Sequence, residues 1–235
     1  MNPLSSLYAA ASGLRNTLYD RGVLRPRSLA RPVISVGNLS AGGTGKTPFV
    51  IALAQLLQAR GISVDVLSRG YRRKTRGVLP VDPNGTPAEF GDEPLLIARR
   101  LGVPVIVGES RYQAGQFAEQ RFPSQLHILD DGFQHRSLAR DFDIVLLAAD
   151  DLRDRLLPTG RLRESISSLR RADAVVIPQG SDIDCTELQG KPVWRMVAYC
   201  LGTRRIASGD DATHVRVSPD CGCRHDDDGA GLRRS

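Results

Sequence analysis

Cysteine is scarce in this sequence and absent from its first 180 residues. The four cysteines are Cys185, Cys200, Cys221 and Cys223, so no disulfide framework holds the body of the chain, which fits a reducing compartment. The N-terminus lacks the charged segment followed by an apolar segment that a secretory signal requires. No run approaches the roughly 18 apolar residues of a transmembrane helix. We therefore expect an intracellular protein that is either soluble or attached to a membrane surface.

Aromatic residues and lysines are also few. Aromatic residues make up 5% of the chain. Most of the 32 basic residues are arginines, and because there are 26 acidic residues the net charge is +6. An excess of arginine favours phosphate-bearing or anionic partners. Only residues 72–76 form a basic cluster, and no basic stripe is interleaved with aromatic side chains. We therefore expect no nucleic-acid partner.

Short apolar runs recur along the chain and alternate with helical patterns. These runs lie at residues 32–36, 63–67, 104–107, 126–129, 142–148 and 174–177. They lack the alternation of polar and apolar residues that marks a strand with one solvated face. The pattern predicts an α/β fold in which helices cover both faces of a mainly parallel sheet. Ligands of such sheets bind at the carboxyl ends of the strands.

A glycine-rich stretch, residues 37–48, follows the first of these runs and precedes a helical pattern. The N–H groups of such a turn can converge on phosphate oxygens, and the following helix N-terminus adds roughly half a positive charge. In a phosphate-binding loop Lys46 would reach the β- and γ-phosphates and the Thr47 hydroxyl would bind Mg²⁺. A strict match needs glycine at Ser40, and the alternative is a plain turn that caps a helix. The predicted nucleotide-binding residues are Ser40, Ala41, Gly42, Gly43, Thr44, Gly45, Lys46 and Thr47.

Two signatures of other nucleotide-binding classes are absent. Position 41 is alanine, so the additional lysine of partition-type ATPases is missing. The run at 174–177 is followed by residues 178–182, which do not contain the N-K-x-D pattern that recognises guanine. Both absences argue against a GTPase or a partition ATPase.

Carboxylates lie at three places where strands end or helices begin. Asp130 and Asp131 directly follow an apolar strand, where a carboxylate binds Mg²⁺ between phosphates or, alternatively, caps a turn. Asp92 and Glu93 begin a helix, where an acid is commonly a cap and less often catalytic. Glu164 ends the segment 157–164, which offers arginines for phosphate and a carboxylate for metal.

The two ends of the chain differ in composition from its middle. Residues 3–20 place leucines at helical spacing, which predicts a helix that either packs on the domain or lies in a membrane interface. Residues 208–235 hold few large apolar residues, and an unstructured segment is favoured there. The alternative is a metal site, although the spacing matches no standard zinc pattern. The candidate ligands of that site are His214, Cys221, Cys223 and His225.

Five motifs together resemble one family. Residues 32–48, 67–71, 91–94, 130–135 and 157–164 occur in the same order in the tetraacyldisaccharide 4'-kinases, which act in lipid A biosynthesis in Gram-negative bacteria. The resemblance covers residues 1–198 and accounts for Ser40, because the family's loop tolerates a small hydroxyl residue there. The implied organisation is a docking helix and linker at 1–31, a P-loop kinase core at 32–198 and a disordered tail at 199–235.

The resemblance implies transfer of the ATP γ-phosphate to the 4'-hydroxyl of a tetraacyldisaccharide 1-phosphate by a monomer at the cytoplasmic face of the inner membrane. It implies that Asp92 is the catalytic acid or base and acts together with Lys46. The basic cluster at 72–76 would contact the 1-phosphate of the acceptor. The residues placed around Mg²⁺ are Thr47, Asp130, Asp131 and Glu164.

The sequence departs from the family near Tyr199. Family members continue into a smaller C-terminal domain that contributes a histidine to catalysis, and no matching motif follows here. We therefore expect this chain to be poorly active as it stands. Two alternatives remain at this point. One is an ATP-binding remnant that sits on the membrane without turnover, and the other is a metallochaperone ATPase that uses Cys221 and Cys223.

Overall fold

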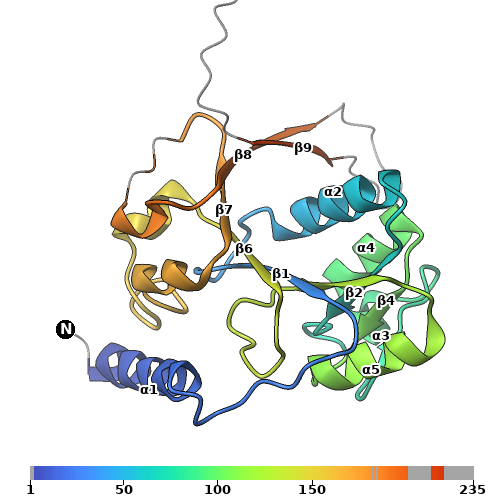
Figure 1. Cartoon of the computed structure of the whole chain (residues 1–235), viewed down its shortest axis with the longest axis horizontal. Coiled ribbons are helices and arrows are strands. Elements are labelled where there is room, and N and C mark those ends of the chain that lie inside the picture. Colours follow the sequence, from blue (N-terminus) through green and yellow to red (C-terminus); the bar gives the residue numbers. More distant parts are fainter. Residues whose placement is uncertain (1–2, 182, 184, 201–212, 220–235) are drawn as a thin grey trace, which may run out of the picture.

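The computed structural model describes residues 3–181, 183, 185–200 and 213–219. Its centre is a nine-stranded sheet with the strand order β3-β4-β2-β5-β1-β6-β7-β8-β9 (Figure 1). All neighbouring strands are parallel except the pairs β3–β4 and β8–β9 at the two edges. The predicted α/β class with a mainly parallel sheet is therefore confirmed.

The strands correspond closely to the apolar runs of the sequence. Those in the middle of the sheet are buried on both faces, which is why their sequences are continuously apolar. The strands are β1 (Val33–Asn38), β2 (Val64–Ser68), β3 (Leu79–Pro80), β4 (Val105–Val107), β5 (Leu126–Asp130), β6 (Phe142–Leu146), β7 (Ala174–Pro178), β8 (Val193–Cys200) and β9 (Thr213–Pro219).

Helices lie on both faces of the sheet (Figure 1). Successive strand residues point to opposite faces, so Val66 packs in one apolar layer with α2 and α4, whereas Leu67 packs in another with α5. The helices are α1 (Pro3–Asp20), α2 (Lys46–Ala59), α3 (Pro87–Phe90), α4 (Asp92–Leu101), α5 (Arg111–Arg121) and the short 3₁₀ helices η1 (Ala149–Arg153), η2 (Ile166–Arg171) and η3 (Thr186–Leu188).

The predicted disorder of residues 199–235 does not extend to residues 213–219. This segment forms β9, which pairs antiparallel with β8 from Trp194↔Pro219 to Cys200↔Thr213. The sequence of this segment did not predict a strand, because strand formation here depends on pairing with the edge of β8. The rest of the predicted tail, including Cys221, Cys223 and His225, lies outside the described residues.

A close backbone approach fixes the carboxyl end of β1 against the turn that follows β5. A Cβ at Gly37 would lie 2.5 Å from the Cβ of Phe133 and 2.8 Å from its backbone nitrogen, so only glycine fits there without displacement. The Phe133 side chain is fully buried. This contact brings the segment after β1 and the segment after β5 to the same place, and the candidate site is built between them.

Candidate active site

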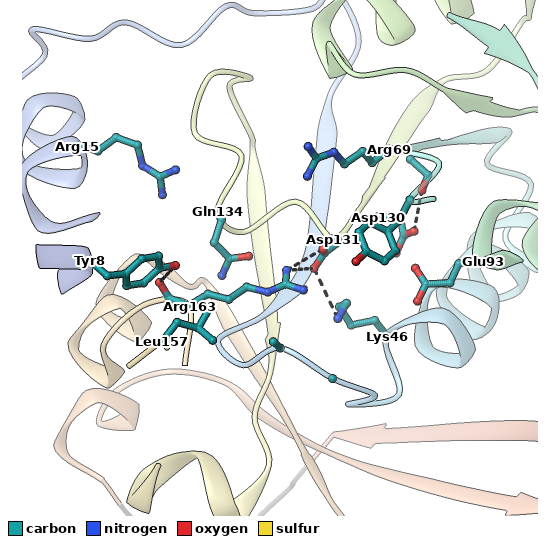
Figure 2. Close-up of a pocket in the computed structure, with 14 residues that line it drawn as sticks. Tyr8, Arg15, Lys46, Arg69, Glu93, Asp130, Asp131, Gln134, Leu157 and Arg163 are labelled. Carbon is teal, nitrogen blue, oxygen red and sulfur yellow. Dashed lines mark hydrogen bonds and ion pairs between the residues drawn. The ribbon is translucent and has the colours of Figure 1, made fainter. Parts of the chain in front are cut away.

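A cavity of about 570 Å³ opens at the carboxyl ends of β1, β2 and β5 (Figure 2). Its position agrees with the general rule for ligand sites in parallel sheets. Segments far apart in the sequence supply its walls. The lining residues are Tyr8, Arg15, Ala41, Gly42, Lys46, Ser68, Arg69, Tyr71, Glu93, Asp130, Asp131, Gln134, Leu157 and Arg163.

The predicted phosphate loop forms one wall of this cavity. Gly45 adopts a left-handed conformation (φ 79°) that turns the chain into α2, and Lys46 is the first residue of that helix. The Lys46 Nζ donates a hydrogen bond to Asn38 Oδ1 at 2.9 Å and lies 3.5 Å from Asp131 Oδ1. The only strict mismatch to the motif, Ser40, forms an extended bridge with Leu162, a conformation that does not require glycine.

The rest of the loop leaves polar groups available to a ligand. A Cβ added at Gly42 or Gly43 would meet no atom within 4 Å, so this side of the loop faces open space. The Thr44 hydroxyl oxygen is buried and has no hydrogen-bond partner within the described part of the chain. Thr47 is buried in the first turn of α2. An anion that reached the loop would meet backbone N–H groups and the helix N-terminus.

Asp130 ends β5 at the base of the cavity. Ser68 donates a hydrogen bond to Asp130 Oδ2 at 3.0 Å, and Asp130 Oδ1 is buried without a partner in the described residues. Burial, with the nearby charges of Glu93 and Asp131, raises the pKa of Asp130 to about 7. A buried carboxylate oxygen that lacks a donor fits a hard divalent cation such as Mg²⁺.

Asp131 has the opposite electrostatic setting although it is the next residue. Arg163 donates to both carboxylate oxygens, at 3.1 and 2.8 Å, and Lys46 lies close by. Burial alone would raise the pKa of Asp131, but Lys46 and Arg163 outweigh it and hold this pKa below its usual value. Asp131 is therefore charged at neutral pH and aligns two cations beside the phosphate loop.

The two acidic residues that begin α4 point in different directions. Glu93 lines the cavity, whereas Asp92 is exposed and does not line it. The turn after β2 holds this helix end in place, because Gly91 (φ 90°) lies against Gly70 and Tyr71. The sequence identified the pair, but it could not show which of the two side chains enters the cavity. The catalytic role of Asp92 stays a prediction.

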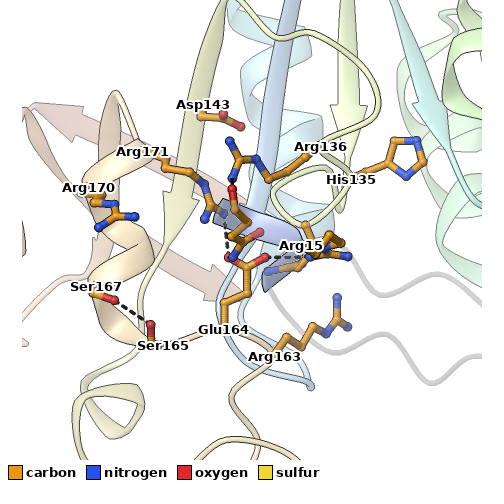
Figure 3. Close-up of polar contacts among 12 residues, drawn as sticks. Arg15, His135, Arg136, Asp143, Arg163, Glu164, Ser165, Ser167, Arg170 and Arg171 are labelled. Carbon is orange, nitrogen blue, oxygen red and sulfur yellow. Dashed lines mark hydrogen bonds and ion pairs between the residues drawn. The ribbon is translucent and has the colours of Figure 1, made fainter. Parts of the chain in front are cut away.

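Glu164 is buried and is held by ion pairs with Arg15 and Arg171. It is 1% exposed and does not line the cavity, and both of its carboxylate oxygens are engaged (Figure 3). One accepts from Arg15 at 3.2 Å, and the other accepts from Asn16 at 3.2 Å and Arg171 at 2.7 Å. In this arrangement the acceptor sites of Glu164 are largely occupied by two guanidinium groups and an amide. The metal-binding role of Glu164 stays a prediction.

The basic cluster at 72–76 also lies outside the cavity lining. Arg73 donates to Glu109 and to the carbonyl of Gly77, and Arg72 stacks over the Tyr71 ring at 5.3 Å. The cavity receives Arg69 from this region instead. The sequence could have indicated Arg69, because this polar residue directly follows the end of β2 at Ser68.

A protein-family comparison decides the family. The model described as tetraacyldisaccharide-1-P 4'-kinase matches residues 1–218. The chain belongs to this kinase family. The match extends past Tyr199, where the resemblance seen in the sequence stops, and ends within β9.

Individual members of the kinase family support this assignment. The tetraacyldisaccharide 4'-kinase of Koribacter versatilis is 53% identical over 203 residues, which cover 83% of this chain and 63% of that protein. The kinase of Aquifex aeolicus is 48% identical over 199 residues, which cover 83% and 62%. The crystal structure of Aquifex aeolicus LpxK in complex with ATP superposes with a TM-score of 0.78 at 46% identity and covers 84% of this chain and 64% of that one. The chain thus spans a little under two thirds of these relatives.

In this chain, α1 is attached through its polar face. Tyr8 donates to the carbonyl of Arg163 at 3.0 Å, Asp20 pairs with Arg136, and Arg15 pairs with Glu164. The apolar face points away, with Leu7 68% exposed and Leu14 63% exposed. The helix therefore packs on the domain, as one of its two predicted roles requires, and leaves Leu7 and Leu14 exposed. Its membrane role stays a prediction.

Glu164→Gln tests whether Glu164 anchors α1. The amide cannot accept from two guanidinium groups as a carboxylate does, so we expect the free energy of unfolding to fall by about 1–3 kcal/mol. Hydrogen exchange in α1 should accelerate, as measured by mass spectrometry. Asp150→Asn, at an exposed position, should stay within about 0.5 kcal/mol of wild type. Unchanged stability together with weaker Mg²⁺ binding would instead support a metal-binding role for Glu164.

Proposed function

We propose that this chain binds ATP at the phosphate loop and transfers the γ-phosphate to the 4'-hydroxyl of a tetraacyldisaccharide 1-phosphate. The observation that supports this most directly is the cavity itself, in which Lys46, the unpartnered oxygen of Asp130 and the cations beyond them face one space. ATP in the related crystal structure supports the nucleotide, and the family description supports the acceptor.

At the nucleotide end, the loop residues from Ser40 to Thr47 would cradle the phosphates. Lys46 would exchange its present partners, Asn38 and Asp131, for the β- and γ-phosphates. Thr47 and Asp130 are the residues proposed to hold Mg²⁺, with Asp131 nearby. The ion would neutralise charge on the phosphates. No group of three or more His, Cys, Asp or Glu side chains in the described segments forms a metal cluster, so phosphate oxygens and water would complete the coordination.

At the acceptor end, we propose that Asp92 takes the proton of the 4'-hydroxyl as its oxygen attacks the γ-phosphorus and ADP leaves. Asp92 is exposed next to Glu93, which lines the cavity, so it lies beside the space proposed to hold the sugar. Positioned proton transfer is typically worth about 10²–10⁴ in rate. Asp92→Asn should therefore lower turnover by that factor and leave the affinity for ATP unchanged.

The assay incubates the purified chain with Mg²⁺, γ-labelled ATP and the lipid acceptor in mixed micelles, and it follows label on the lipid. Label at the 4'-position that depends on Asp92 supports the proposal. Equal labelling by wild type and Asp92→Asn would overturn the role of Asp92. ATP binding without labelled lipid would favour the alternative of a nucleotide-binding protein that does not turn over.

We also propose that the chain works as a monomer bound peripherally to the cytoplasmic face of the inner membrane. Within the part of the chain that the structure describes, no helix has the length and apolar character needed to cross a bilayer. The exposed Leu7 and Leu14 on α1 support interfacial docking, because the polar face of this helix already contacts the protein.

Liposome flotation tests this docking. Full burial of one leucine contributes about 1.5–3 kcal/mol, so the double variant Leu7→Asp/Leu14→Asp should lose most of its binding to anionic vesicles. Leu56→Asp is the matched control, because Leu56 is 49% exposed on α2. Unchanged flotation of the α1 variant would contradict the docking role. Light scattering after gel filtration tests the monomer.

A further inference from the structure

Arg69 enters the cavity without a partner. It is exposed, and no hydrogen bond or ion pair of its side chain occurs among the described residues. Each of the other lining cations is paired. Lys46 and Arg163 lie against Asp131, and Arg15 lies against Glu164. A guanidinium group that faces a cavity with its donors free is a binding group for an anion.

A second, buried arginine lies close enough to Arg69 for the two charges to repel, while Asp130, Asp131 and Glu109 act on that arginine in the opposite sense. Arg111 is 5% exposed, and its Nε is buried without a partner in the described structure. Burial, and next the charge of Arg69, lower the pKa of Arg111 to about 10. Burial and the charges of Arg111, Arg140, Arg69 and Arg15 lower the pKa of His135 to about 4. An anion placed here would relieve the repulsion between Arg69 and Arg111.

Arg69 and Lys46 occupy different parts of the cavity wall. Arg69 directly follows β2, whose last residue, Ser68, donates to Asp130, whereas Lys46 begins α2 and lies against Asn38 and Asp131. In Figure 2, Arg69 and Lys46 lie on either side of Asp131. The two cations are therefore placed for different phosphate groups.

We propose that Arg69 binds the phosphate that the acceptor already carries, the 1-phosphate, and so distinguishes phosphorylated from unphosphorylated disaccharide lipids. This inference rests on the proposed function for the identity of the acceptor. Arg69 thereby takes the role that the sequence analysis gave to the basic cluster at 72–76, which does not line the cavity. Arg69 sets which acceptor binds, while Lys46 serves the nucleotide.

Equilibrium binding without ATP tests this assignment. The probes are tetraacyldisaccharide 1-phosphate and the same lipid without its phosphate, each in detergent micelles. A charge-assisted contact predicts that wild type prefers the phosphorylated lipid by about tenfold to a hundredfold. Arg69→Met should reduce this preference to within about threefold, and Arg69→Lys should retain part of it. Arg121→Met, at an exposed arginine stacked on Phe117, should keep the wild-type preference.

Four results would overturn the assignment. Three of them are an equal affinity of wild type for both lipids, a preserved preference in Arg69→Met, and a loss of preference in Arg72→Met but not in Arg69→Met. A fourth is weaker binding of a fluorescent ATP analogue to Arg69→Met, because it would place Arg69 on the nucleotide. If wild type shows the preference but transfers no phosphate, the lipid-binding subsite stands and the proposed kinase activity fails.

Discussion

Replacing Lys46 with methionine is expected to lower phosphate transfer by at least about 10²–10³-fold, the usual effect of removing one donor from a developing negative charge. Lys46 is the cation of the loop, and its ammonium group already lies 2.9 Å from Asn38 Oδ1 in the ligand-free arrangement. Methionine has a similar length and no charge. Affinity for Mg²⁺·ATP, measured with a fluorescent analogue, should fall together with turnover.

Lys74→Met is the matched control for this experiment. Lys74 is exposed on the segment after β2 and does not line the cavity, so its replacement should leave ATP affinity and transfer unchanged. If Lys46→Met retained wild-type ATP affinity, the phosphate loop would not be the nucleotide site. The affinity measurement gives this answer independently of turnover.

Asp130→Asn is expected to change the pH dependence of stability. The pKa of Asp130 is raised to about 7 in the folded protein, above its value of about 3.9 when unfolded. Between these values the folded state binds the additional proton, so the free energy of unfolding of wild type falls as pH rises and levels off above pH 7. At about 1.4 kcal/mol per pKa unit, wild type should lose about 3 kcal/mol relative to Asp130→Asn between pH 5 and pH 8.

Urea unfolding without Mg²⁺ and nucleotide measures this difference, and Asp154→Asn is its control, because Asp131 itself acts on the pKa of Asp130. The hydrogen bond from Arg161 lowers the pKa of Asp154, so the contribution of Asp154 to stability is present above pH 4 and is lost only as pH falls below that. The difference between wild type and Asp154→Asn should therefore stay flat from pH 5 to pH 8. A flat difference for Asp130→Asn as well would contradict the raised pKa.

Local sequence was sufficient for the six strands from β4 to β7 in the sheet order and for the phosphate loop. The apolar runs are strands because both faces of a parallel sheet are covered, and the loop was recognisable because its strand, turn and helix start are contiguous in the sequence. Asp130 was found for the same reason, since it follows a strand directly. The family motifs added the acceptor, which no spacing of residues indicates.

The parts that sequence missed depend on contacts between distant segments. Glu164 meets Arg15 and Asn16, which precede it by 149 and 148 residues, and no local pattern specifies where α1 lies. Glu93 rather than Asp92 faces the cavity because adjacent helical residues differ by about 100° in direction. Strand β9 exists because β8 offers an unpaired edge.

The attachment of α1 through ions rather than apolar contacts makes it sensitive to its solvent. In water, salt should first weaken the contacts of Asp20 with Arg136 and Arg170, because exposed ion pairs are screened at physiological ionic strength. In the Arg15–Glu164 pair the carboxylate is buried, so this ion pair should persist as the salt concentration rises. At a bilayer surface, where the local dielectric constant is lower, the same ion pairs strengthen. The helix should therefore be held more firmly at a bilayer surface than in free solution.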